Sequence, residues 1–198
     1  MMKQTCVMVM GVLLAGFAYA DLAGGVNLLA NPSFEEPTIE PWLNDGCLSL
    51  SISTLDAVDG VQSLKMYYDS DYDAVYQALP VGPGDLYQTF QMTFSVKSLE
   101  NKPVIVRAGI WEFSPNGITF NESDWVAVGT EWQTISYETA LNRDNTDAIR
   151  AVVQCAPQDT PKTPGNLLVD DVRLIKVVPE PAAMLLLGLG GLILRMRK

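Results

Sequence analysis

Acidic side chains are the first candidates for chemistry in this sequence. Asp170 and Asp171 interrupt the apolar run 167–176, and Glu35 follows Phe34 early in the chain. A carboxylate inside an apolar strand is costly unless it is paired or liganded. Two acids could also act as the acid and base of a glycosidase. We expect no such activity, because these acids fall at edge and surface positions and no cleft-forming insertion is visible.

Histidine is absent from the whole sequence. Its absence removes the usual general base and the commonest transition-metal ligand, and a Ser-His-Asp arrangement cannot form. The sequence therefore predicts that this protein is not an enzyme. An alternative for Asp170 and Asp171 is that they are solvated, or paired with Arg173 or Lys65.

A second set of candidates combines aromatic rings with planar polar groups on outward-facing strand positions. These residues are Tyr76, Arg107, Trp111, Arg150 and Gln154, with Gln91 as a neighbour and Tyr72 as a further rim residue. Aromatic faces pack against the C–H groups of sugars, while guanidinium and amide groups bond hydroxyls. For Trp111 the alternative is a hydrophobic plug beneath the polar loop 114–124.

Strands must position these residues, because the stretch 21–177 shows no sustained helical period. Short alternating apolar runs recur between turn residues, a pattern typical of β-sandwiches and barrels. We expect strands at 26–29, 47–53, 63–68, 74–81, 87–97, 104–113, 132–139, 148–156 and 167–176. The positions expected to face the core include Phe90, Met92, Phe94, Val96, Val104, Val106, Ala108, Ile110, Ile149, Ala151, Val153 and Cys155.

Both flanks of this stretch have the features of membrane-directed signals. Residues 1–20 have an apolar centre and end in Ala-Tyr-Ala, which predicts a cleaved signal peptide, or alternatively a retained anchor. Residues 178–198 carry Pro179, Glu180 and Pro181, then the uncharged run 182–194 and a basic end. This run is short for a span of about 20 residues, yet it predicts a transmembrane helix rather than a buried core helix.

The expected domain, 21–177, is strongly acidic. Of the 13 basic and 23 acidic residues, Lys3, Arg195, Arg197, Lys198 and Glu180 lie outside it, which leaves nine bases, twenty-two acids and a net charge of −13. Such a charge argues against nucleic acid as a partner. Cys47 and Cys155 remain after signal removal, and an even count in an exported chain predicts one disulfide between them.

The tail resembles the PEP-CTERM sorting signal of Gram-negative bacteria in its Val-Pro-Glu-Pro motif, its Leu/Gly-rich span and its Arg/Lys cluster. The resemblance implies export, transient anchoring in the inner membrane by the C-terminal helix, and processing by an exosortase-type enzyme near Pro179–Pro181. The expected destination is the cell surface or the extracellular matrix.

The domain resembles the galactose-binding-like jelly rolls of bacterial carbohydrate-binding modules. The similarity is carried, in order, by the stretches Asn27–Glu35, Gly60–Lys65, Gln77–Gly84, Glu131–Gln133 and Leu168–Leu174. It implies a single all-β jelly-roll sandwich and a polysaccharide ligand. It also implies a structural Ca²⁺ held by Glu35 and Asp170. Our first hypothesis is a non-catalytic carbohydrate-binding protein; the alternative is a structural or adhesive matrix protein with no sugar ligand.

Overall fold

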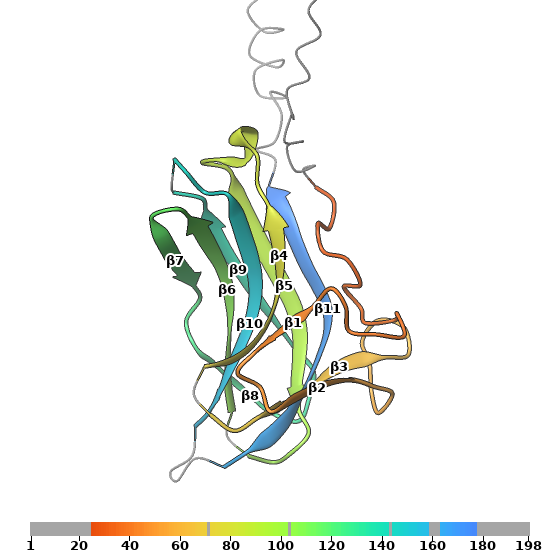
Figure 1. Cartoon of the computed structure of the whole chain (residues 1–198). Helices are drawn as coiled ribbons and strands as arrows, with labels where there is room; N and C mark the ends of the chain where they lie inside the picture. Colours follow the sequence, from red (N-terminus) through yellow and green to blue (C-terminus); the bar gives the residue numbers. More distant parts are fainter. Residues whose placement is uncertain (1–24, 71, 103, 143, 159–162, 178–198) are drawn as a thin grey trace, which may run out of the picture.

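The structure, a computed structural model, describes residues 25–70, 72–102, 104–142, 144–158 and 163–177. They form two antiparallel sheets packed face to face, which confirms the all-β sandwich (Figure 1). The five-stranded sheet has the order β2 (Ser49–Ser53), β3 (Ser63–Tyr68), β11 (Gly165–Val177), β5 (Thr89–Ser98) and β9 (Gln133–Ala140). The six-stranded sheet has the order β1 (Leu43–Asp45), β4 (Asp73–Pro80), β10 (Ala148–Pro157), β6 (Val104–Ser114) and β7 (Gly117–Glu122), with β8 (Val126–Val128) also paired to β6.

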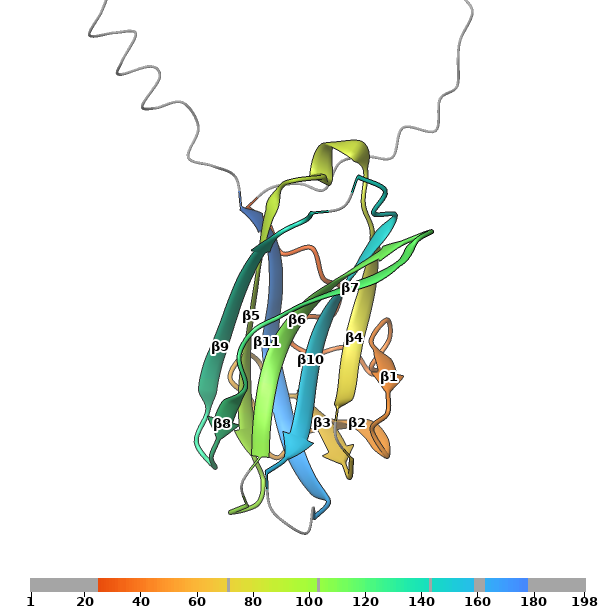
Figure 2. The same cartoon turned by 90° about the vertical axis from the view of Figure 1, so that its left-hand side faces the viewer.

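The core lies between the two sheets and is built by strand alternation. Every residue expected to face the core is fully buried: Phe90, Met92, Phe94, Val96, Val104, Val106, Ala108, Ile110, Ile149, Ala151, Val153 and Cys155. Because successive side chains point to opposite faces, burying one face fixes the direction of the other. The outward positions of β6 and β10 therefore share the outer face of the six-stranded sheet, which faces the viewer in Figure 2.

Two parts of the strand prediction are wrong, and the prediction also lacks the short strands β1 and β8. The region 114–124, expected as a polar loop, contains β7, which forms a hairpin with β6 through the pair Ser114↔Gly117. The stretch 26–29 is not a strand, although Leu28 N donates to Leu174 O at 2.9 Å along β11. In the first case Pro115 and Asn116 mark only the turn. The alternation of Ile118 and Phe120 beyond the turn is typical of a strand.

The predicted disulfide is also wrong. Cys47 and Cys155 are both free and buried. The Cys47 thiol donates to the carbonyl of Ala74 at 3.4 Å. Burial, with a smaller contribution from Asp73, raises the pKa of Cys47 to about 12, and burial raises that of Cys155. Both residues act as small apolar core side chains, a role that an even cysteine count does not distinguish from pairing.

Helical structure among the described residues is limited to the 3₁₀ turn η1 (Pro83–Asp85) between β4 and β5. No helix in this part of the chain has the length and apolarity that crossing a membrane requires. The predicted signal peptide, the sorting motif and the apolar run of the tail lie outside the described residues.

Candidate functional site

The five residues predicted to bind sugar come together on the outer face of the six-stranded sheet. Arg107 lies opposite Gln154 across the β6–β10 pairing, and Trp111 lies opposite Arg150. Tyr76 on β4 is opposite Val152 on the other side of β10. The shared face follows from alternation on three adjacent strands. Gln91, expected as a neighbour, lies instead on β5 in the five-stranded sheet.

Arg107 belongs to a network of polar contacts on this face. Its Nη1 lies 2.6 Å from Oε2 of Glu122 on β7, and its Nε donates to Oε1 of Gln154 at 2.7 Å. The same Glu122 accepts a hydrogen bond from Trp111 Nε1 at 3.0 Å. The guanidinium lies 4.3 Å from the ring centre of Trp125. The charge and much of the hydrogen-bonding capacity of Arg107 are therefore satisfied within the protein.

Arg150 is held differently. Its Cζ lies 4.1 Å from the ring centre of Tyr76 and 4.1 Å from that of Phe113, so aromatic rings pack on the guanidinium from two neighbouring strands. Within the part of the chain that the structure describes, its side chain has no ion pair and no hydrogen bond. The in-plane N–H groups of Arg150 thus remain as donors on this face.

Trp111 presents little of its indole to solvent. It is 7% exposed, and Phe120 packs against it edge to face with ring centres 5.0 Å apart. This geometry fits the alternative in which Trp111 is a plug. The most exposed aromatic side chains of this face are instead Phe120, 58% exposed, and the predicted rim residue Tyr72, 60% exposed.

Sequence reasoning missed four residues on this face: Phe113, Phe120, Glu122 and Trp125. The two on β7, Phe120 and Glu122, could have been found from the alternation beginning at Ile118. Trp125 carries no such signal, because it precedes the short strand β8 and reaches Arg107 only in the folded chain.

Glu35 and Asp170, the predicted calcium ligands, both bind backbone N–H groups of the segment 58–62. Oε1 of Glu35 accepts from Val61 N and Gln62 N at 2.8 and 2.7 Å. Oδ2 of Asp170 accepts from Val58 N and Asp59 N at 2.6 and 2.9 Å. Backbone donors therefore engage Oε1 of Glu35 and Oδ2 of Asp170, two of the oxygens that the predicted Ca²⁺ would need as ligands.

Contrary to the expected edge or surface position, Asp170 is fully buried in the middle of β11, an inner strand of its sheet. Burial raises the pKa of its carboxyl group, although three backbone N–H bonds, including one from Asp171 N at 2.7 Å, oppose this effect. Across the described residues, no group of three or more acidic, cysteine or histidine side chains is arranged to hold a metal ion. The calcium site therefore stays a prediction, and the hydrogen bonds explain how Asp170 is accommodated without one.

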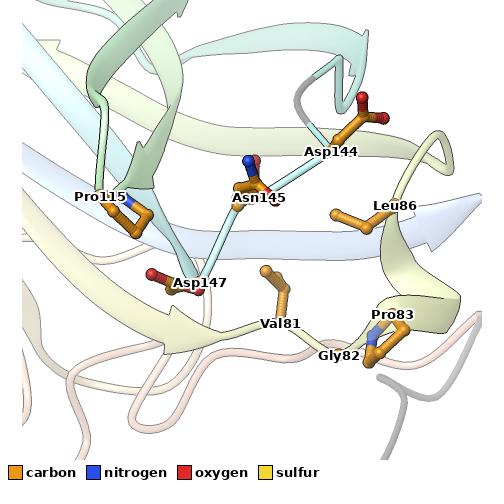
Figure 3. Close-up of a pocket in the computed structure, with 9 residues that line it drawn as sticks. Val81, Gly82, Pro83, Leu86, Pro115, Asp144, Asn145 and Asp147 are labelled. Atoms are coloured by element: carbon orange, nitrogen blue, oxygen red, sulfur yellow. The ribbon is translucent and has the colours of Figure 1, made fainter.

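A cavity of about 630 Å³ lies at one end of the sandwich (Figure 3). It is bounded by η1, the β6–β7 turn and the loop before β10, and its lining residues are Val81, Gly82, Pro83, Leu86, Pro115, Asp144, Asn145, Thr146 and Asp147. Among the residues that the structure describes, this lining has no aromatic ring and no cation. The outer face of the six-stranded sheet, which has both, is therefore the better candidate for a sugar site.

Residues 177–198 match the PEP-CTERM protein-sorting motif, which confirms the predicted sorting tail and indicates an exported protein with at least transient membrane attachment. No match to this sequence was found among curated proteins.

Several solved structures with a similar fold are carbohydrate-binding modules. The CBM22-1 xylan-binding domain of Paenibacillus barcinonensis Xyn10C has a TM-score of 0.61 and 17% identity, over 81% of this chain and 99% of that one. The C-terminal family 22 module of Clostridium thermocellum Xyn10B has a TM-score of 0.57 and 18% identity, over 76% and 98%. TmCBM61, solved with β-1,4-galactotriose, has a TM-score of 0.52 and 18% identity, over 76% and 99%. At these identities the likeness concerns the fold.

Proposed function

We propose that this protein is an exported, non-catalytic glycan-binding module that holds polysaccharide at the cell surface or in the extracellular matrix. The observation that carries the proposal is the outer face of the six-stranded sheet. There, exposed rings of Tyr72 and Phe120 lie beside planar polar groups supplied by Arg107, Arg150 and Gln154. Rings that pack on sugar C–H groups next to donors for hydroxyls are what a sugar site needs.

The sorting tail supports the location. In the proposed sequence of events the apolar run 182–194 anchors the chain in the inner membrane. An exosortase-type enzyme then processes the chain near Pro179–Pro181. The last described strand ends at Val177, so processing there would release or attach the complete sandwich.

Replacing Tyr72 with Ala tests the sugar face. Tyr72 lies at the edge of this face, with its ring 6.1 Å from Trp125 and 5.7 Å from the Arg107 guanidinium. We expect Tyr72→Ala to weaken binding to a responsive polysaccharide about tenfold, because one stacking surface is lost. Affinity electrophoresis against glucans, xylan and acidic polysaccharides measures the change.

Tyr87→Ala is the matched control. Tyr87 is 61% exposed and, like Tyr72, has a positive φ, but it lies in the loop before β5, away from this face. Its replacement should leave binding unchanged. Wild-type protein that binds none of the polysaccharides would refute the sugar-binding proposal.

The second candidate is a structural or adhesive matrix protein without a sugar ligand. It is favoured by the covered indole of Trp111 and by the internal bonds that Arg107 makes with Gln154 and Glu122. Under this hypothesis the network only stabilises the sheet. The absence of glycan binding, together with retained assembly at the cell surface, would support it.

A further inference from the structure

Among the described arginines, Arg150 alone forms no ion pair, and of the described lysines Lys65 and Lys102 form none either. Four of the described Lys and Arg side chains form ion pairs, in the pairs Lys97–Asp56, Arg107–Glu122, Arg173–Asp171 and Lys176–Asp85. Arg150 has no such partner among the described residues, although acids outnumber bases in the domain by thirteen. In so acidic a chain, a cation that no carboxylate neutralises requires an explanation.

The surroundings of Arg150 explain why it has no acidic partner. Its register partners are Trp111 on β6 and Ala78 on β4, and its neighbours along the same face of β10 are Ala148 and Val152. None of these carries a carboxylate. The nearby acid on this face, Glu122, is already bound by Arg107 and Trp111. The face therefore keeps one uncompensated positive charge.

The two stacked rings also orient the guanidinium. Tyr76 and Phe113 each lie 4.1 Å from Cζ, and the side chain is half-buried. Stacking restricts the group and leaves its coplanar N–H donors as its free hydrogen-bonding edge. A pair of parallel N–H donors is matched by the two coplanar oxygens of a carboxylate, which forms a bidentate, charge-assisted pair with Arg.

We propose that the outer face of the six-stranded sheet binds a carboxylate-bearing glycan, one that contains uronic acid, and that Arg150 receives the carboxylate. This inference rests on the proposed function and adds the class of ligand. The net charge of the domain repels a polyanion at long range, but salt screens that repulsion beyond about 8 Å at physiological ionic strength. The contact at Arg150 acts at shorter range, in a partly buried setting.

The test compares oligosaccharides of galacturonic, glucuronic and mannuronic acid, each with its carboxyl-reduced neutral form. Titration calorimetry at about 0.15 M salt measures both affinities for the same protein. We expect at least one uronic oligosaccharide to bind about tenfold more tightly than its reduced form, as a charge-assisted bidentate pair would allow. In Arg150→Gln this preference should disappear while binding of the neutral form persists, and in Arg150→Lys it should be partly retained.

Arg173→Gln is the control, because it removes an equal charge from the opposite, five-stranded sheet. The Arg173→Gln variant should keep the preference for the uronic oligosaccharide over its reduced form. Thermal unfolding of each variant verifies that Arg150→Gln is folded. Equal or tighter binding of the neutral forms by the wild type would overturn the inference but leave the proposed function in place. An undiminished preference in Arg150→Gln would overturn the role of Arg150, and no binding to any form would overturn both proposals.

Discussion

At the residue scale, Asp170 shows how a charged group is accommodated inside an apolar strand. Its carboxylate is fully buried, yet it accepts backbone hydrogen bonds from Val58, Asp59 and Asp171. Unpaired, such a group would be strongly destabilising. The bonds to Val58 and Asp59 also hold the segment 56–62 against β11, so this one side chain joins a loop and a strand that are distant in sequence.

The pKa of Asp170 predicts a pH dependence of stability. Burial raises the pKa of Asp170 in the folded protein above its ordinary value of 3.8. A raised pKa means that the native state holds the proton more tightly. The contribution of Asp170 to the free energy of unfolding is therefore greatest below about pH 3.8 and is lost as the pH rises through the folded pKa. We expect the destabilisation caused by Asp170→Asn to be larger at low pH than at pH 7, measured by urea unfolding.

If Asp170→Asn were instead more destabilising at pH 7 than at low pH, the folded state would favour the anionic form of Asp170. A bound Ca²⁺ would have that effect, so the same melts with and without a chelator test the calcium prediction. A melting temperature that chelation leaves unchanged would remove the predicted calcium site. A drop in the wild type that is absent from Asp170→Asn would establish a cation site at Asp170.

At the element scale, buried Glu112 joins three segments at one end of the six-stranded sheet. From β6 it accepts a bond from Asn121 Nδ2 on β7 at 2.7 Å. It also accepts from Asn142 N at 3.1 Å and from Thr146 Oγ1 at 2.9 Å, both in the loop before β10. One carboxylate therefore helps to position both the β7 hairpin and this loop.

Glu112→Ala should destabilise the domain by roughly 3 kcal/mol, because several donors lose a charged acceptor in a buried site. Chemical denaturation measures this loss. Glu138→Ala is the control, because Glu138 is an exposed residue of β9 and its removal should change stability by less than about 0.5 kcal/mol. A Glu112→Ala variant as stable as this control would show that the loop and hairpin do not depend on the carboxylate.

At the scale of the whole molecule, the first and last described residues lie at the same end of the sandwich (Figure 1). Gly25 N donates to Lys176 O at 3.1 Å. The Lys176 side chain pairs with buried Asp85 at 2.9 Å, which fixes the end of β11 to η1. The sandwich is thus closed by its own residues up to Val177.

A fragment of residues 21–177 should therefore unfold cooperatively, at the same melting temperature as the full-length chain. Circular dichroism during heating measures both transitions. A fragment that ends at residue 163 should not fold, because it lacks β11, which lies between β3 and β5 in the middle of its sheet. A broad, non-cooperative melt of 21–177 would instead mean that segments beyond it complete the core.

The sequence alone determined the class of fold, the direction of most core side chains and the sorting tail. Alternation suffices for the first two, because it fixes which residues of one strand share a face. The tail is a linear motif, which is recognised from the sequence without knowledge of the fold. The same alternation placed Arg107, Trp111, Arg150 and Gln154 outward, as the structure has them.

Only the tertiary structure decided which outward residues meet. Gln91 and Arg107 both point outward, yet they belong to opposite sheets. β10 pairs with both β4 and β6, so Gln154 lies beside Arg107 at a separation of 47 residues. The structure also showed that Cys47 and Cys155 are free thiols. Strand pairing depends on contacts between distant segments. The pattern within one strand therefore could not reveal that Arg107 has an acidic partner, while Arg150 has none among the residues that the structure describes.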